Sequence, residues 1–286
     1  MTDINQYNIG NKDKSDICSG LYFVPTPIGN LRDITVRALD ILMHCDVIVC
    51  EDSRVTGKLL AAYSIPKKKK IIYNDHASQE TKDYIISLAD EGRIIAVISD
   101  AGTPMISDPG YKLARDAIAN GVYITALPGA NAILPAIQLS ALPCDKFTFG
   151  GFLPSKDKAI GDVIKGYVGR PETLVFYDSP KRVEKSCAII SGILTGQSIK
   201  IVREISKIYE ESISYNSKID LSGLKGEIVI VIEGSIDGGQ TDYDLDDLIL
   251  KAIDAGQSMK ELSAGIAIQT GLKKKDIYNH ALTLKN

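Results

Sequence analysis

The sequence is poor in the residues on which metal and disulfide chemistry depend. Its 286 residues include no tryptophan, three histidines and only five cysteines, which are Cys18, Cys45, Cys50, Cys144 and Cys187. The cysteines are odd in number and form no CxxC pair, so the sequence supports neither a disulfide framework nor a zinc site. With so few histidines, we also expect no histidine-rich metal centre.

Long hydrophobic runs are also missing. No apolar run approaches the roughly 20 residues that span a bilayer, and the first twenty residues are polar rather than signal-like. We therefore expect a cytoplasmic protein with no membrane partner. The formal net charge of −3 argues against a broad polyanion-binding surface. It leaves local basic patches at Lys67 to Lys70, Lys156 with Lys158, Lys181 and Arg182 with Lys185, and Lys273 to Lys275, although a solvated face or a guard at a strand edge is the more common explanation of each such run taken alone.

The length and the apolar content predict more than one domain. Hydrophobic residues make up 44% and charged residues 24% of the chain, which suffices for two cores. The polar, aperiodic start predicts a disordered tail over residues 1–19. We expect an N-terminal α/β domain over residues 20–143, a C-terminal α/β domain over residues 144–236 and a helical extension over residues 237–286.

Short apolar runs alternate with helical patterns through most of the chain. In the first domain, strands are predicted at residues 21–24, 47–50, 70–73, 94–98 and 122–125. Asp33 is the expected N-cap of a helix whose apolar face includes Val36 and Leu39. This alternation predicts a mostly parallel sheet covered by helices on both sides. The second domain repeats the pattern with strands at residues 173–177, 199–202 and 228–232.

Unusual residues gather where the predicted strands end. The stretch from Ser99 to Gly110 follows a buried strand and interleaves glycine and proline with hydroxyls and carboxylates. Gly102 would let a ligand approach the main chain where a Cβ would block it. On its own this stretch could simply connect a strand to a helix. Several other strand ends share the design, however, and ligands of open α/β sheets bind at the carboxyl ends of the strands.

Several long motifs occur in one order along the chain. They are LYFVPTPIGNLRDITVRALD, CEDSRVTGKLL, ISDAGTPMISDPGYKLARDA, LPGANA, GFLPSKDK, LVFYDSPKR, REISKIYEE and KGEIVIVIEG, and they are distributed between residues 21 and 234. In these motifs the chain resembles the ribosomal RNA methyltransferases of the tetrapyrrole-methylase-like superfamily. The helical tail SMKELSAGIAIQTGLKKKDIYNHAL is also similar to the C-terminal segment of that family.

The resemblance implies a fold and a reaction. The fold is two α/β domains of the tetrapyrrole methylase (class III methyltransferase) type, with the methyl donor S-adenosylmethionine in the cleft between them. The reaction is 2′-O-methylation of a cytidine of 16S rRNA near the decoding centre, within the small ribosomal subunit, by a homodimer. The residues agree with this chemistry, because a sulfonium donor needs neither a metal nor a nucleophilic cysteine. The glycine signature of Rossmann-type methyltransferases, a Walker A loop and a GxSxG elbow are all missing.

The resemblance also implies which residues contact the methyl donor. They lie in three loops of the first domain and, as weaker matches that could also be core, in the second domain. The set is Pro25, Ile28, Asp100, Gly102, Thr103, Ile106, Asn131, Ala132, Phe176, Tyr177, Ile208 and Gly226.

A proton acceptor and an RNA-binding surface are harder to assign. A hydroxyl nucleophile benefits from a group that takes its proton, and the candidates are Glu51, Asp52, His76 and Glu204. Glu51 and Asp52 could instead belong to a structural ion pair, and His76 could be an ordinary surface histidine. Phosphates of the RNA could be held by Arg32, Arg54, Lys181 and Arg182.

The chain departs from the family pattern at one motif. The family usually has a glutamate at position 178 and a histidine at position 181, where this chain has Asp178 and Lys181. An essential histidine at position 181 is therefore not expected here. Two alternatives stay open: a tetrapyrrole C-methyltransferase of the same superfamily, and a catalytically silent RNA- or ribosome-binding relative.

Overall fold

A computed structural model describes residues 14–74, 77–235, 245–270, 272 and 274–284. Within it the chain forms two compact units. The first comprises residues up to Pro135 together with the segment Glu204–Glu210, and the second comprises Ala136–Arg203 and the chain from Glu211 onward. The helix α5 (Ile133–Ser140) contains the point where the first unit gives way to the second.

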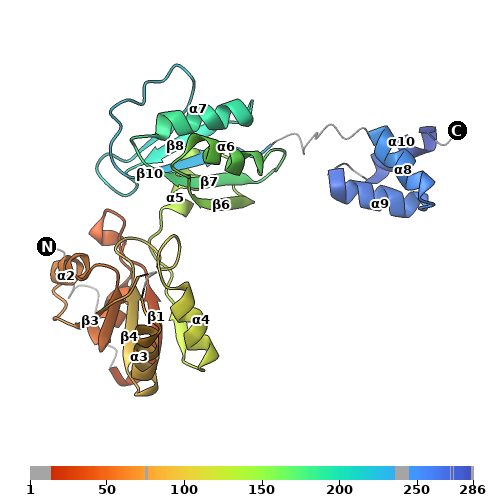
Figure 1. Ribbon diagram of the computed structural model, residues 1–286. Coiled ribbons are helices and arrows are strands. Elements are labelled where there is room, and N and C mark those ends of the chain that lie inside the picture. The colour runs from red at the N-terminus through yellow and green to blue at the C-terminus, as the bar shows by residue number, and fades with distance from the viewer. Residues whose placement is uncertain (1–13, 75–76, 236–244, 271, 273, 285–286) are drawn as a thin grey trace. The chain divides into compact units, whose positions relative to one another are not determined.

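The first unit is built on a parallel sheet of five strands in the order β3-β2-β4-β1-β5 (Figure 1). The strands are β1 (Gly20–Val24), β2 (Val47–Cys50), β3 (Lys69–Ile72), β4 (Ile94–Ile98) and β5 (Ile124–Ala126). The helices are α1 (Val36–His44), α2 (Ser53–Ala62), α3 (Gln79–Asp90) and α4 (Tyr111–Ala119). Strands β1 and β4 are buried along their whole length, as their continuous apolar runs predict for central strands.

Helices cover both faces of this sheet. The side chains of α1 and α2 pack with Tyr22, Ile48 and Ala96 on one face. The side chains of α3 and α4 pack with Leu21 and Val97 on the other. The predicted parallel sheet with two covered faces is confirmed.

Two local expectations for the first unit are wrong. Helix α1 begins at Val36, and its N-cap is Thr35, whose hydroxyl accepts from the backbone N–H of Ala38 at 3.1 Å. Asp33 instead ends a short 3₁₀ turn, Leu31–Asp33, because Asn30 caps that turn first. Disorder over residues 1–19 is contradicted for residues 14–19, since Ile17 packs against the core; residues 1–13 lie outside the described part of the chain.

The second unit contains a mixed sheet in the order β6-β7-β10-β8-β9. The strands are β6 (Phe147–Phe152), β7 (Thr173–Asp178), β8 (Ile199–Arg203), β9 (Glu211–Ser214) and β10 (Ile228–Ile232). Only β6 and β7 are parallel neighbours. Helices α6 (Asp157–Lys165) and α7 (Val183–Ile193) pack on one face of the sheet through Ile160, Ile164, Val183 and Ile190.

The C-terminal segment forms three helices, α8 (Leu245–Asp254), α9 (Met259–Thr270) and α10 (Lys274–Leu284). They share a small core of their own that includes Ile249, Leu262 and Ile277.

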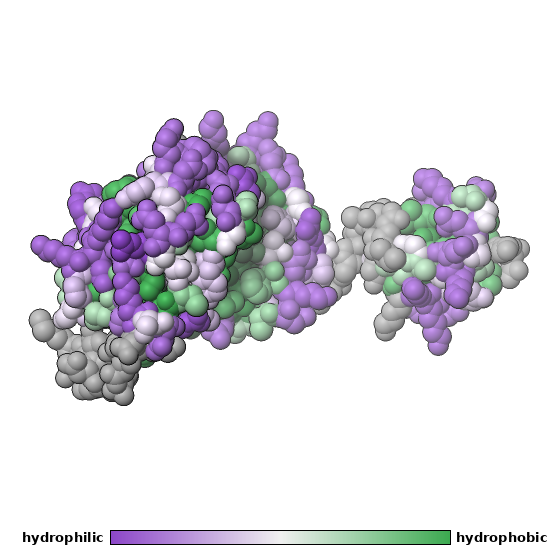
Figure 2. All heavy atoms as spheres, turned by 90° about the horizontal axis from the view of Figure 1, so that it is seen from below, coloured by the Kyte–Doolittle hydropathy of each residue, from purple (hydrophilic) through white to green (hydrophobic). Residues whose placement is uncertain are grey.

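On the visible face of the molecule, hydrophobic areas appear between hydrophilic ones (Figure 2). In the described part of the chain, none of the helices combines the length and hydrophobicity that a membrane span requires.

Candidate functional site

Three loops of the first unit meet at one edge of its sheet. They follow β1, β4 and β5, and β1 lies between the other two strands. After β1 the chain enters α1 on one face of the sheet, whereas after β4 it enters α4 on the opposite face. Adjacent parallel strands whose connections leave toward opposite faces create a crevice at their carboxyl ends, which is where ligands of such sheets bind.

Hydrogen bonds join the loops after β1 and β4. Thr26 and Gly102 form an isolated antiparallel bridge in which each backbone N–H donates to the other residue's carbonyl at 2.9 Å. The buried Thr26 hydroxyl donates to the Ser99 carbonyl at 3.1 Å. The loop after β5 joins them, because the Thr103 hydroxyl donates to the Ala130 carbonyl at 3.0 Å. The three loops therefore form one connected structure.

Two glycines allow the loops to approach closely. Gly102 has φ +80°, and a Cβ added there would lie 3.4 Å from Cγ2 of Ile28 and 3.9 Å from the Ala130 carbonyl oxygen. A Cβ at Gly129 would lie 2.7 Å from Cβ of Pro25, which is too close for any side chain. Because the N–H and carbonyl of Gly102 are already bonded to Thr26, Gly102 can serve a ligand by close approach rather than by hydrogen bonding.

The structure thus brings together the predicted donor residues that lie in the loops after β1, β4 and β5. Asp100 and Ile106 are exposed, whereas Pro25 is buried and Ile28 and Thr103 are partly buried. Asn131 and Ala132 lie just before α5, and the Asn131 side-chain oxygen accepts from the Leu134 backbone N–H at 2.9 Å. Met105 and Ser107 have φ of 73° and 63°, a strained conformation that non-glycine residues keep when the surrounding structure fixes it.

The loop after β2 lies beside the loop after β4. The Asp52 backbone N–H donates to Oδ1 of Asp100 at 3.2 Å. Asp52 also caps α2, and its carboxylate pairs with Arg54 through Nη2 at 2.8 Å and through Nε. The hydrogen bonds from Arg54 lower the pKa of Asp52 to about 2. So weak a base is poorly suited to accept a proton at neutral pH.

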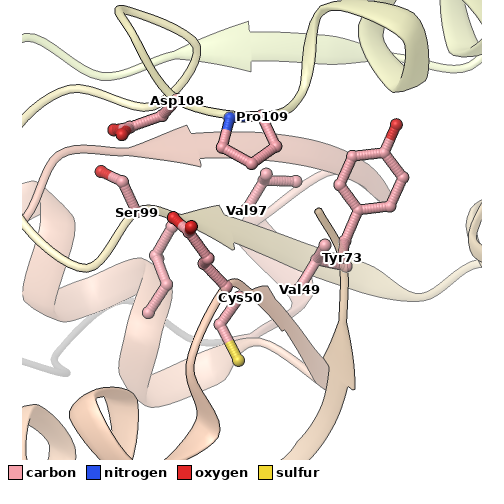
Figure 3. A pocket seen from close by; sticks show the side chains of 9 residues that line it. Val49, Cys50, Tyr73, Val97, Ser99, Asp108 and Pro109 are labelled. Atoms are coloured by element: carbon pink, nitrogen blue, oxygen red, sulfur yellow. The ribbon is translucent and has the colours of Figure 1, made fainter. Parts of the chain in front are cut away.

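A hollow between the ends of β2 and β4 contains a carboxylate whose pKa is closer to neutral pH than that of Asp52. It measures about 230 Å³, including the space open to solvent, and its lining includes Cys50, Glu51, Ser99 and Asp108. Figure 3 shows the Asp108 carboxylate and the Ser99 hydroxyl facing each other at its mouth. Burial raises the pKa of Asp108 to about 6; a hydrogen bond with Ser99 opposes this rise, and the charges of Glu51 and Asp100 add to it. Asp108 was not among the residues selected from the sequence.

The segment Glu204–Glu210 belongs to the first unit although it lies between β8 and β9 in sequence. The Lys207 side chain packs on Gly29, where an added Cβ would lie 2.4 Å from Cγ of Lys207. Lys207 Nζ pairs with Oε1 of Glu204 at 2.9 Å, so this candidate proton acceptor is held in an ion pair. The side chain of Ile208, a predicted donor contact, is 94% exposed.

The remaining predicted donor residues lie in the second unit. Phe176 is buried in the core, where its ring packs edge-on against Tyr167. Tyr177 points to the opposite face of the sheet, against the rings of Phe149 and Phe152. Gly226 has φ +93°, so the turn before β10 favours glycine there.

The four predicted phosphate-binding residues differ in their surroundings. Arg32 and Lys181 are exposed, and the side chain of Arg54 is exposed although it is paired with Asp52. Arg182 instead donates through Nε to the fully buried carboxylate of Asp178 and through Nη2 to the Leu153 carbonyl at 2.7 Å. The Arg182 guanidinium is therefore largely occupied by contacts within the protein.

His76, a candidate proton acceptor, lies outside the described residues. Across the residues that are described, no group of three or more histidines, cysteines and acidic side chains is arranged to hold a metal ion.

Comparison with known proteins places this arrangement in a family. The model of the Tetrapyrrole (Corrin/Porphyrin) Methylases matches residues 20–215. The chain is 39% identical over 271 residues to ribosomal RNA small subunit methyltransferase I of Rickettsia prowazekii (strain Madrid E), covering 91% of this chain and 93% of that protein. It is 34% identical over 271 residues to the protein of the same name from Bacillus subtilis (strain 168), covering 91% and 92%.

Solved structures of more distant proteins share the fold. Uroporphyrin-III-C-methyltransferase from Thermus thermophilus superposes with a TM-score of 0.53 at 16% identity, covering 75% of this chain and 94% of that chain. A cobalt precorrin-4 methyltransferase of cobalamin biosynthesis superposes with a TM-score of 0.55 at 18% identity, covering 78% and 97%.

Proposed function

Because the chain belongs to the Tetrapyrrole (Corrin/Porphyrin) Methylases family, we propose that it transfers a methyl group from S-adenosylmethionine to ribosomal RNA of the small subunit. The observation that carries this proposal is the similarity, at 34% to 39% identity and over more than 90% of the chain, to proteins named ribosomal RNA small subunit methyltransferase I. In detail, we propose that the acceptor is the 2′-hydroxyl of a cytidine of 16S rRNA near the decoding centre.

The loops after β1, β4 and β5 suit the methyl donor. The close approach at Gly102 leaves room beside Ile28 that a Cβ would occupy. The exposed Ile106 offers apolar surface, and the exposed Asp100 carboxylate offers a partner for a cationic group. When bound, S-adenosylmethionine supplies a methyl group activated by its sulfonium charge. Ile28, Gly102, Thr103 and Ile106 would hold it, and Asp100 would orient it.

Asp108 is the proposed acceptor of the hydroxyl proton. The Ser99 hydroxyl lies between Asp108 and the donor loops, because its single proton can be donated either to the Asp108 carboxylate or to the Gly102 carbonyl, which is 3.1 Å away. A pKa of about 6 leaves Asp108 mostly ionised at neutral pH yet more basic than an ordinary aspartate. Among the candidates from the sequence, Asp52 is too weak a base and Glu204 is paired with Lys207. Glu51, which lines the same hollow, would raise the basicity of Asp108 by its charge.

The assembly and the location of the protein belong to the same proposal. A homodimer, a cytoplasmic location and action on the assembled small subunit follow from the resemblance to the family. Sedimentation of the purified full chain would measure its oligomeric state. The domain limits at residues 143 and 236 are likewise proposals, which limited proteolysis followed by mass spectrometry of the fragments would test.

A transfer assay tests the proposed reaction. Purified protein is incubated with S-adenosylmethionine labelled in the methyl group and with small ribosomal subunits from a strain that lacks this enzyme. We expect label in the RNA. If the protein binds the donor but labels neither subunits nor free rRNA, the proposal is wrong. A cyclic tetrapyrrole offered in parallel would identify the alternative reaction, and no transfer to either substrate would indicate a binding protein.

A further inference from the structure

A cluster of three aromatic rings lies on the second unit at the carboxyl end of β6 and β7. The rings of Phe149 and Phe152 both pack edge-on against Tyr177, with centroids 4.9 and 5.1 Å apart. Phe149 and Tyr177 are partly buried, whereas Phe152 is 62% exposed. An exposed aromatic ring held by two others is a preformed stacking surface.

A bulge in β6 puts these rings on the same face. Phe149 pairs with Val175 and Phe152 pairs with Tyr177, so three steps along β6 match two steps along β7. The extra residue is accommodated at Gly151, which has φ +74°. In a regular strand, residues three apart point to opposite faces, and Phe152 would point away from Tyr177.

Three lysines lie on the segments that directly follow the two strands. Lys156 and Lys158 follow β6, Lys181 follows β7, and all three are exposed. Within the described part of the chain, none of them makes an ion pair. The Arg182 guanidinium, bonded to the Leu153 carbonyl, ties the two segments together.

Two of the nearby acidic groups are already paired with cations, and the exposed Glu184 at the start of α7 is a third acidic group. Asp157 pairs with Lys185 at 2.6 Å, and Asp178 pairs with Arg182. The three lysines therefore give the surroundings of Phe152 an excess of positive charge, although the whole chain has a net charge of −3. A two-fold contact between copies of this surface would oppose lysine to lysine, which disfavours a second copy as its partner.

We propose that this surface binds single-stranded RNA, with an unpaired base stacked on Phe152 and phosphates held by Lys156, Lys158 and Lys181. The inference rests on the proposed function for its choice of RNA as the partner. Unpaired bases are recognised by stacking on aromatic side chains, and the backbone by nearby cations. Here the aromatic ring ends β6, Lys156 and Lys158 follow it within six residues, and Lys181 follows β7, whose Tyr177 packs against the ring.

The stacking is tested with the full chain and a fluorescent single-stranded RNA of about ten nucleotides, by anisotropy. Phe152→Ala and Phe152→Leu should weaken binding by about five- to 150-fold, whereas Phe152→Trp should restore it. The matched control is Phe147→Ala, because Phe147 is exposed on the same strand and lies outside the ring cluster. Affinities of Phe152→Ala and Phe152→Leu equal to that of the unaltered chain would overturn the proposal.

The charge contribution is tested by salt dependence. Each phosphate contact on a single strand contributes about −0.7 to the slope of log K against log salt concentration, so replacing all three lysines by glutamine should reduce the slope by about 2. Lys165→Gln, at the far end of α6, is the control. A slope that the triple variant leaves unchanged would exclude the lysines as phosphate ligands.

Two further measurements separate this proposal from its competitors. Calorimetric affinity for S-adenosylmethionine should be the same in Phe152→Ala and the unaltered chain, and sedimentation should show the same oligomeric state. If the affinity for S-adenosylmethionine changes while RNA affinity does not, the surface contributes to binding of the methyl donor. If the oligomeric state changes while RNA affinity does not, the surface contacts a second copy of the chain. If the unaltered chain methylates rRNA while Phe152→Ala binds RNA normally, only this inference fails. If RNA binding depends on Phe152 but no rRNA is methylated, the proposed reaction fails and this inference stands.

Discussion

Replacing Gly102 by alanine tests whether the loop after β4 contacts the methyl donor. Gly102 has φ +80°, a conformation that costs an L-residue about 1–2 kcal/mol. The added Cβ would lie 3.4 Å from Cγ2 of Ile28, which is tight but requires only a small shift of a side chain. We therefore expect the variant to fold, with a loss of about 1–2 kcal/mol in the free energy of unfolding.

Binding of S-adenosylmethionine should suffer more than stability does. The new methyl group would occupy space beside Ile28 that we assign to the donor, so we expect at least a tenfold rise in Kd, or about 1.4 kcal/mol. Isothermal titration calorimetry measures the affinity directly. Thermal unfolding without ligand measures the stability cost, at about 2–4 °C per kcal/mol for chains of 150–250 residues.

Gly92 provides a matched control for backbone strain. It has φ +83°, lies in the turn between α3 and β4, and an added Cβ there meets nothing within 4 Å. Gly92→Ala should therefore lose the same 1–2 kcal/mol and keep full donor affinity. If Gly102→Ala binds the donor as the unaltered chain does, the loop is not part of the donor site. Equal losses of affinity in both variants would attribute the effect to strain alone.

Three further predictions concern other residues. The methylation rate of the unaltered chain should rise as pH increases through about 6, since only the ionised Asp108 accepts a proton, and Asp108→Asn should abolish this rise. The same change should stabilise the fold at pH 8 by about 1 kcal/mol and not at pH 3, because a raised pKa stabilises the folded state only where the carboxyl is protonated; equal melting shifts at both pH values would refute this. Arg182→Ala should cost about 3 kcal/mol by leaving Asp178 as an unpaired buried charge, whereas Lys181→Ala should be neutral, and indistinguishable melting curves would contradict the ion pair. Gly20→Ala should prevent accumulation of folded protein, because the Cβ would lie 2.2 Å from a backbone carbonyl oxygen; a stable variant would rule out that packing.

The sequence predicted the parts of the fold that depend on local pattern. Central strands such as β4 are continuous apolar runs, and the glycine-bearing loops after them mark the edge of the sheet. Strand β9 was missed because Glu211–Ser214 is a short, mostly exposed edge strand with no apolar run. Asp33 and Thr35 are both good N-caps, and the choice between them depends on the turn that Asn30 caps just before.

Side-chain partners were less accessible to prediction. Arg182 is a predicted phosphate ligand, but its guanidinium pairs with the buried carboxylate of Asp178, four residues earlier in the chain. Asp108 was overlooked because its raised pKa arises from burial and from Glu51, which belongs to another loop. The sequence contains one indication that Asp108 belongs to the site, which is its position in the same loop as Gly102. Sequence spacing places residues at a strand end, whereas the tertiary structure decides which of them are engaged with one another.

The central claim is methyl transfer to a ribose oxygen of small-subunit rRNA. The most direct measurement digests the labelled RNA from the transfer assay to nucleosides and separates them by chromatography with mass detection. The account predicts that the label elutes as 2′-O-methylcytidine and maps to one position of 16S rRNA. Label on a base, or RNA without label although the protein binds S-adenosylmethionine, would contradict it.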